Sequence, residues 1–156
     1  MTYILHREQW IGHPVEEVFA FFADAQNLER ITPPWLGFKI LSMSTSCISE
    51  GTLIRYRLRL HGIPIHWQTE ICAWNPPFSF VDEQMEGPYE QWRHTHRFEA
   101  HGGRTKMIDE VRYSLPFGVL GRIVHALKVR RDVGNIFDYR CRQIDALFGH
   151  PEKDAA

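Results

Sequence analysis

No stretch of about eighteen consecutive apolar residues, the length of a membrane-spanning helix, occurs in this 156-residue sequence. Its first ten residues, MTYILHREQW, alternate apolar and polar side chains. They therefore lack the continuous apolar region of an export signal. We expect a cytoplasmic protein without a membrane span.

Cysteine is scarce, and the three that occur, Cys47, Cys72 and Cys141, lie far apart. An odd number of cysteines with no C-x-x-C spacing argues against a disulfide framework and against a zinc knuckle. All three are expected to be free thiols.

Charge of one sign is also lacking, because 18 lysines and arginines stand against 19 aspartates and glutamates, for a formal net charge of -1. Bulk electrostatic attraction to nucleic acid or to an anionic membrane is therefore not expected, which leaves only a local basic patch as a source of such attraction. Large rings, by contrast, are abundant: aromatic residues make up 13% of the chain, with five Trp and ten Phe. This content suits a packed core or an apolar pocket.

The chain length falls in the usual range for one domain. We expect a single domain over residues 1–150 and a polar tail over 151–156. Within the domain, hydrophobic periodicity predicts an α+β order that begins with a strand. The expected elements are, in order, a strand at 3–11, a helix pair within 13–31 broken near Asn27 and ended before Pro33, and strands at 37–43, 52–60, from 65 onward, 78–85 and twice within 91–113.

The segment TLIRYRLRL, residues 52–60, places apolar residues and arginines in strict alternation, which indicates one dry and one wet face. If HGIP, residues 61–64, is the hairpin loop, the next strand pairs with it so that both faces agree in polarity. The expected pairs are Leu60 with Ile65, Leu58 with Trp67, Tyr56 with Thr69, Ile54 with Ile71 and, on the outer face, Arg55 with Glu70.

A second hairpin is indicated by Gly102-Gly103, which suits a two-residue turn. The strands on either side again agree in polarity, with apolar partners on the inner face. The expected pairs are His96 with Asp109, Phe98 with Met107, His94 with Val111, Trp92 with Tyr113 and, on the outer face, Glu99 with Lys106. By parity, Asp82 and Gln84 of the preceding strand should share the inner wall.

After LPFG, residues 115–118, the periodicity becomes helical and predicts one long terminal helix, bent at Gly134 and ending near Gly149. Its apolar positions are Leu120, Ile123, Val124, Leu127, Phe137, Ile144, Leu147 and Phe148. Its basic positions are Lys128, Arg130, Arg131, Arg140 and Arg142. We interpret the basic residues as a solvated face, with recognition of an acidic partner as the functional alternative.

Four segments are characteristic: HPVEEVFAFFADAQNLERITPPW, EGTLIRYRL, WNPPFSFVDEQMEGPYEQWRHTHRF and GRTKMIDEVRYSLPFG. Together with the order of the elements, they resemble the START-like, birch-pollen-allergen-like (SRPBCC) superfamily of polyketide cyclases and dehydrases, in particular its small bacterial ligand-binding branch. The resemblance implies a helix-grip fold, in which a curved seven-stranded antiparallel sheet wraps around a long C-terminal helix and two short helices follow the first strand. It also implies a cavity between the sheet and that helix.

The resemblance does not settle the function, because one fold hosts many activities. The leading hypothesis is binding of a small hydrophobic molecule such as a lipid, quinone, polyketide or aromatic compound. The alternatives are a cyclase or dehydratase and a regulatory protein that contacts a macromolecule through its C-terminal helix. No cofactor is expected. The residues expected to line the cavity are Tyr56, Trp67, Phe80, Asp82, Trp92, His94, His96, Phe98, Asp109 and Tyr113.

Four roles are open to His94, His96 and Asp109. They could satisfy each other as buried polar groups, or orient the polar end of a ligand. Asp109 could also hold His96 for acid–base catalysis, which makes these two the candidate catalytic residues. The fourth role is a metal site with His94, His96 and Asp109 as ligands. We expect no metal, because the resemblance brings none and short H-x-H matches arise freely.

Overall fold

The computed structural model describes residues 1–149, so the tail expected at 151–156 lies outside the described residues. The order of its elements is as expected: one strand, two short helices, six further strands and a long C-terminal helix. They are β1 Thr2–Ile11, α1 Val15–Ala23, α2 Gln26–Ile31, a 3-10 turn Pro34–Leu36, β2 Lys39–Met43, β3 Leu53–Leu60, β4 Ile63–Asn75, β5 Ser79–Glu86, β6 Gln91–His101, β7 Arg104–Ser114, α3 Gly118–Val124, a π-helical segment His125–Val129 and α4 Arg130–Phe148.

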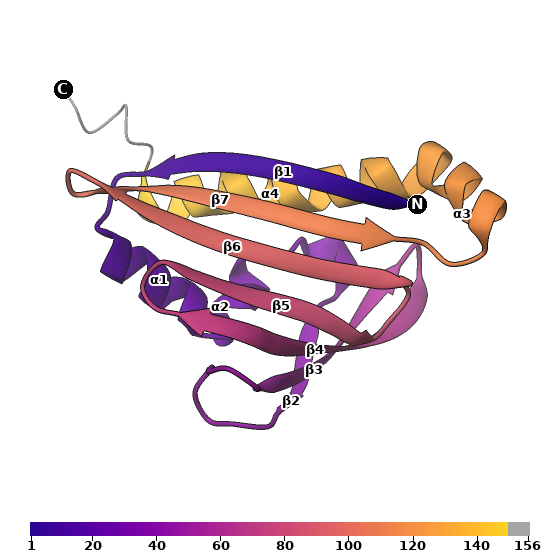
Figure 1. The fold of residues 1–156 in the computed structure, drawn as a ribbon, viewed down its shortest axis with the longest axis horizontal. Helices are drawn as coiled ribbons and strands as arrows, with labels where there is room; N and C mark the ends of the chain where they lie inside the picture. Colours follow the sequence, from indigo (N-terminus) through magenta and orange to yellow (C-terminus); the bar gives the residue numbers. More distant parts are fainter. Residues whose placement is uncertain (150–156) are drawn as a thin grey trace.

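The seven strands form one antiparallel sheet in the order β1-β7-β6-β5-β4-β3-β2. The sheet curves, and the helices lie on one of its faces (Figure 1). The expected helix-grip fold is confirmed, with its two short helices after the first strand. Among the described residues, no helix is both long enough and apolar enough to span a membrane.

The helix pair breaks at Asp24 and Ala25, slightly before the expected Asn27. The Asp24 carboxylate accepts a hydrogen bond from the backbone N–H of Gln26 at 3.0 Å, which starts a new helix there. Asn27 instead lies inside α2, and its side-chain amide donates to the carbonyl of Phe21 at 3.0 Å. The two helices are thereby fixed to each other at the break.

The predicted register of β3 and β4 is wrong by two residues. In the structure the hairpin turn is His61-Gly62 alone, with φ of 51° and 81°. Two residues in the left-handed region match the twist of the flanking strands, so this shorter turn is favoured over a four-residue loop. The observed pairs are Leu60 with Ile63, Leu58 with Ile65, Tyr56 with Trp67, Ile54 with Thr69 and Arg55 with Gln68.

A shift of two residues leaves every side chain on its expected face, because side chains alternate with period two. Trp67 therefore still points inward and is buried, while His66 is exposed on the outer face. On that outer face, Arg55 donates to the side-chain oxygen of Gln68 at 3.0 Å in place of the expected contact with Glu70.

The β6–β7 hairpin has the predicted register, including the pairing of His96 with Asp109. Its turn is Gly102-Gly103, with φ of 55° and 81°, a conformation that residues with a Cβ rarely adopt. The residues predicted for the inner face of this hairpin, among them His96 and Asp109, are therefore paired as expected.

The C-terminal helix runs for 31 residues from Gly118 to Phe148, but its irregularity lies at His125–Val129 and not at Gly134, which is inside α4. The π-helical segment places His125 against the sheet, where the hydroxyl of Tyr113 lies 2.9 Å from its Nε2 and the ring of Tyr3 stacks at 3.4 Å. This contact accounts for the position of the irregularity.

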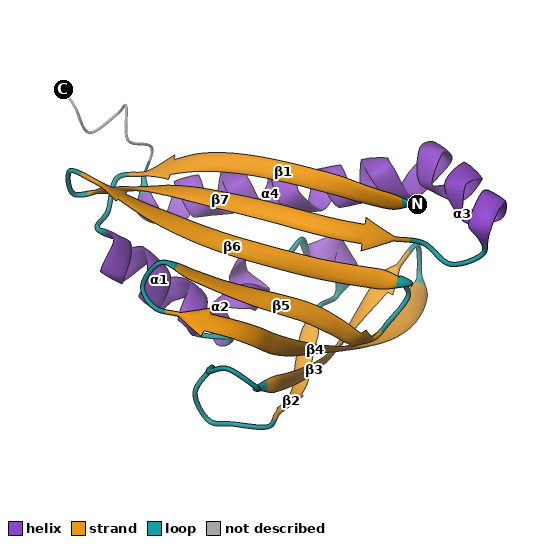
Figure 2. Cartoon of the chain, viewed as in Figure 1, coloured by secondary structure: helices purple, strands orange, loops and turns teal. Residues whose placement is uncertain are grey.

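Helix α3 projects past the ends of β1 and β7 (Figure 2). Its apolar side chains consequently do not pack on the sheet, although the helical periodicity suggested a buried face. Leu120, Ile123, Val124 and Leu127 are all exposed. The buried face of the long helix belongs to α4, through Val133, Phe137, Arg140 and Ile144.

Candidate functional site

A cavity of about 180 Å³ lies between the sheet and the helices. This space exceeds what one water molecule needs, which is roughly 10–15 Å³ on the same measure. Most of its lining is apolar or aromatic, and the polar exceptions gather at β5 and β6. Of the residues expected to line it, seven do so: Tyr56, Trp67, Phe80, Asp82, Trp92, His94 and His96.

Three expected lining residues lie elsewhere. Phe98 packs in the apolar core with Phe22, and its ring is 2% exposed. Tyr113 contacts His125 under the start of the long helix. Asp109 does not line the cavity itself, although its carboxylate contacts His94 and His96, which do. Parity placed these residues on the correct face of the sheet, but the helices cover that face unevenly.

One end of the cavity reaches the surface. Asp24 is exposed and Asn27 and Thr32 are partly exposed, and all three belong to the lining around α1 and α2. Ile48, from the loop between β2 and β3, completes this end. The cavity is therefore least enclosed beside the short helices.

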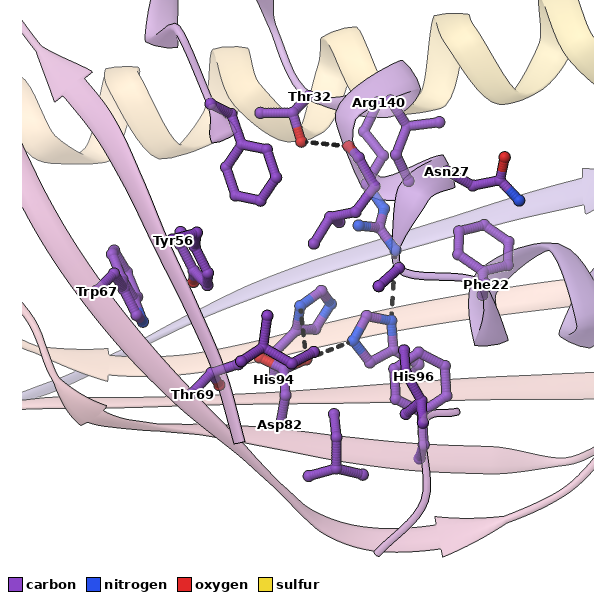
Figure 3. Close-up of a pocket in the computed structure, with 18 of the residues that line it drawn as sticks. Phe22, Asn27, Thr32, Tyr56, Trp67, Thr69, Asp82, His94, His96 and Arg140 are labelled. Carbon is purple, nitrogen blue, oxygen red and sulfur yellow. Dashed lines mark hydrogen bonds and ion pairs between the residues drawn. The ribbon is translucent and has the colours of Figure 1, made fainter. Parts of the chain in front are cut away.

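The polar end of the cavity contains Asp82 on β5 and His94 and His96 on β6 (Figure 3). Asp109 on β7 is not part of the lining but contacts both histidines. His96 Nε2 lies 2.7 Å from Asp82 Oδ2, and His94 Nε2 lies 2.8 Å from Asp109 Oδ1. The register predicted an acid opposite His96 alone, but in the structure each histidine meets a carboxylate. Asp82 reaches the histidines because β5 places it directly opposite His94.

Asp109 nevertheless touches both histidines. Its Oδ1 lies 3.2 Å from His96 Nδ1 in addition to its hydrogen bond with His94. The two imidazole rings lie 3.6 Å apart, centre to centre. The four side chains thus form one connected group, not the isolated His96–Asp109 pair that the register alone suggested.

Arg140 of α4 is the member of this group that the sequence analysis missed. It was assigned to a solvated basic face, yet it is only 7% exposed. Its Nη2 lies 3.3 Å from His96 Nδ1, and its Nε lies 3.6 Å from Asp109 Oδ2. The signal was present in the spacing, since Arg140 follows Val133 by seven residues and so shares the buried face of α4.

The charges of this group follow from its contacts. Burial raises the pKa of the Asp109 carboxyl, but the Arg140 charge and the hydrogen bonds from His94 and His96 outweigh burial and hold this pKa well below its ordinary value. For Asp82, burial again raises the pKa, and its contacts with the same histidines lower it further than burial raises it. Both carboxylates are therefore ionised at neutral pH.

The pKa of His94 is also lowered, but for a histidine this disfavours the charged form. Burial and the neighbouring His96 lower the pKa of His94, and the attraction of Asp109 offsets this only in part. His94 is therefore a neutral imidazole at neutral pH, and it can donate only one N–H.

Two buried donors at the cavity have no hydrogen-bond partner among the described residues, Trp67 Nε1 and Arg140 Nε. The Arg140 Nε is too far from Asp109 for a good hydrogen bond. An unpartnered buried donor costs about 1–3 kcal/mol. An acceptor oxygen placed in the cavity would relieve that cost. The sequence pattern could not show that these two donors lack partners.

A curved antiparallel sheet with a long C-terminal helix against it and a cavity between them defines the class of helix-grip domains. The family model for polyketide cyclase/dehydrase and lipid transport matches residues 11–133. This chain belongs to that family.

Solved structures share the fold at low sequence identity. TTHA0849 from Thermus thermophilus is 19% identical with a TM-score of 0.65, covering 93% of this chain and 99% of its own. The Zhui aromatase/cyclase from Streptomyces sp. R1128 is 14% identical with a TM-score of 0.67, covering 94% and 96%. Ara h 8.0201 is 17% identical with a TM-score of 0.61, covering 94% and 99%. No curated protein sequence matches the chain.

We predict that Arg140→Met lowers the free energy of unfolding by about 3–5 kcal/mol, because it leaves the buried Asp109 carboxylate without its cation. Asp109→Asn in the same chain should restore part of this loss, so that the double variant is more stable than the sum of the two single changes predicts. Urea unfolding at pH 7 measures all four proteins. Arg142→Met, an exposed position on the same helix, is the control, and an equal effect of both arginine changes would contradict the prediction.

Proposed function

We propose that this protein binds a small, mainly hydrophobic molecule that carries a polar group at one end. The observation that carries the proposal is the cavity itself, which has apolar and aromatic walls and one polar end at Asp82, His94, His96 and Arg140. Binding sites for small molecules combine many apolar side chains with a few convergent polar groups in this way.

The two unpartnered donors refine the proposal. Trp67 Nε1 and Arg140 Nε can both donate, so the polar group of the ligand is expected to include acceptor oxygens. A lipid, quinone, polyketide or aromatic compound with a carbonyl or carboxylate meets this requirement. The three cysteines are unpaired, which fits the reducing cytoplasm where we place the protein.

The cavity proposal predicts that an apolar fluorophore with an anionic group, 8-anilinonaphthalene-1-sulfonate, binds with one-to-one stoichiometry. Ile54→Trp should weaken this binding by about tenfold or more, equivalent to about 1.4 kcal/mol, because Ile54 lines the cavity and the larger ring fills it. Fluorescence titration measures the affinity, and native mass spectrometry of protein from its source should show a retained apolar molecule.

Ile63→Trp is the matched control for this experiment, since Ile63 is 65% exposed at the start of β4. Near-ultraviolet circular dichroism verifies that each variant is folded. Equal binding by the wild type and a folded Ile54→Trp variant would place the fluorophore outside the cavity and remove the support for a binding function.

A second candidate, an acid–base enzyme of the cyclase or dehydratase type, is favoured by the contact between His96 and Asp82. A carboxylate that orients a histidine on a cavity wall is a common catalytic arrangement. The sequence pointed to His96 with Asp109; in the structure Asp82 lies closer to His96, and Asp109 contacts both histidines. Proton transfer of this kind needs no nucleophile.

For this candidate, His96→Gln should lower turnover of a substrate found among the retained molecules by about 10²–10⁴-fold, because glutamine cannot move a proton. The dissociation constant of the same substrate should change little, since glutamine keeps a hydrogen bond to Asp82. Unchanged turnover in the variant would exclude a proton-transfer role for His96.

A further inference from the structure

Three ligand atoms of different side chains converge at the polar end of the cavity. Asp82, His94 and His96 each offer one nitrogen or oxygen, and these atoms all lie within 4.8 Å of one another. Asp82 Oδ2 is 2.7 Å from His96 Nε2 and 3.7 Å from His94 Nδ1. Figure 3 shows the three side chains pointing toward one another. The sequence analysis had considered Asp109, not Asp82, as the third ligand.

Asp109 determines which ring nitrogens face this point. Its Oδ1 lies 2.8 Å from His94 Nε2 and 3.2 Å from His96 Nδ1. Arg140 Nη2 lies 3.3 Å from His96 Nδ1 and can only donate, so in the network without a metal His96 Nδ1 accepts from Arg140 and His96 Nε2 donates to Asp82. A metal requires the other tautomer of His96. If both rings then donate their N–H to Asp109 Oδ1, His94 Nδ1 and His96 Nε2 carry lone pairs. Those lone pairs and Asp82 Oδ2 are then three acceptors with no hydrogen atom between them. A cation is the group that three converging acceptors require.

The charge of the surroundings supports this requirement. Two carboxylates, those of Asp82 and Asp109, share this space with one guanidinium, that of Arg140. All of the side chains are buried or nearly so. Burying a carboxylate without a compensating positive charge costs free energy, and a bound cation would supply that positive charge.

We propose that Asp82, His94 and His96 bind a divalent transition-metal ion, and that Asp109 is a positioning residue that holds both histidines in the metal-binding tautomer. Two imidazoles and one carboxylate suit zinc or non-haem iron and leave further coordination positions open. A carboxylate that accepts the distal N–H of a metal-bound histidine is the usual outer-shell partner. The open positions face the cavity, so the metal site goes beyond the proposed ligand binding and does not depend on it.

Calorimetric titration of tag-free, chelator-treated protein with Zn²⁺ tests the proposal, with Mg²⁺ as the comparison ion. We expect one Zn²⁺ per chain and no comparable Mg²⁺ binding, because nitrogen ligands disfavour magnesium. Co²⁺ bound at the same site should give visible absorption bands that Zn²⁺ displaces. Asp82→Asn and His96→Gln should abolish this binding, whereas Asp109→Asn, which keeps all three ligands, should weaken it about 10–100-fold.

His66→Gln is the control variant, because His66 is exposed on the outer face of β4. Histidine ¹⁵N spectra of the wild type should place the remaining ring proton on His94 Nε2 and His96 Nδ1 when Zn²⁺ is bound. Absence of one-to-one Zn²⁺ binding would overturn the site. So would binding that survives in Asp82→Asn, or binding that is lost in His66→Gln. The network would then be held by a His96 N–H donated to Asp82, with Arg140 donating to His96 Nδ1. Fluorophore binding by the metal-free protein reports separately on the cavity.

A second inference rests on a different part of the molecule, the exposed face of α3 and the π-helical segment. Leu120, Ile123, Val124 and Leu127 recur at spacings of three and four, so they form one stripe. The exposed fractions of the apolar side chains here are 81% for Phe117, 70% for Val119, 62% for Leu120, 51% for Ile123, 43% for Val124 and 79% for Leu127.

The opposite face of this helix is the one that packs on the protein. Gly121 lies so close to Pro116 that a Cβ there would meet the Pro116 carbonyl, and His125 is buried against Tyr3 and Tyr113. The apolar stripe consequently points away from the sheet, at the end of the molecule where α3 projects (Figure 1).

The charges beside the stripe are all of one sign. Arg122, Lys128, Arg130 and Arg131 are exposed, and no aspartate or glutamate occurs between residues 117 and 131. A helix with an apolar face flanked by basic residues suits the interface of an anionic bilayer, because the apolar residues enter the headgroup region and the cations remain at its surface. We infer that this face docks on an anionic lipid surface.

Co-sedimentation with vesicles of phosphatidylcholine and phosphatidylglycerol tests this inference, with pure phosphatidylcholine vesicles as the comparison. The wild type should bind the anionic vesicles more strongly, and added salt should weaken binding. Both Leu120→Ser with Ile123→Ser and Arg130→Glu with Arg131→Glu should reduce the bound fraction severalfold. Phe78→Ser should not, because Phe78 is 53% exposed in the turn between β4 and β5, and this turn is hydrogen-bonded to Phe98 under α1, away from α3.

Equal binding to both kinds of vesicle, or none to either, would overturn the docking inference. So would a dimer, seen by sedimentation, that forms in wild-type protein and is lost in the Leu120→Ser, Ile123→Ser variant, because the stripe would then be covered by a second copy of the chain.

Discussion

The buried carboxylate of Asp109 is the contact on which the rest of this structure depends. It lies in the middle of β7, accepts from the histidines of β6 and faces the guanidinium of Arg140 on α4. The long helix is therefore held against the sheet by an ionic contact as well as by apolar packing. Since an unpaired buried carboxylate costs several kcal/mol, this contact favours one relative position of helix and sheet over others.

The sequence was sufficient to predict the sheet, the helices and one complete hairpin. The β6–β7 register was predictable because Gly102-Gly103 readily adopts the positive φ angles of a two-residue turn and because Phe98 and Met107 agree on the inner face. The β3–β4 register was not, since period-two alternation looks the same after a shift of two residues. The β3–β4 register depended on whether His61-Gly62 alone forms the turn. His61 adopts a positive φ, which is harder to predict for a histidine than for a glycine.

The candidate site was only half predictable for a related reason. Parity places a residue on a face of the sheet, but it does not say which element covers that face. Phe98 and Tyr113 were assigned to the cavity and lie under helices, whereas Arg140 was assigned to solvent and lies over the cavity. Phe98 is covered by α1, Tyr113 by the π-helical segment, and Arg140 is brought to the cavity by α4. The positions of these helices depend on contacts between elements far apart in the chain.

The attachment of α4 through Arg140 constrains the polar end of the cavity but not its open end. Moving the helix to enlarge the cavity would separate Arg140 from Asp109, so the chemistry of the polar end and the width of the cavity beside it change together. The end lined by Asp24, Asn27 and Ile48 has no such constraint, because it consists of short helices and a loop. Substitutions at this open end can therefore change the length of the cavity without disturbing the contact between Arg140 and Asp109.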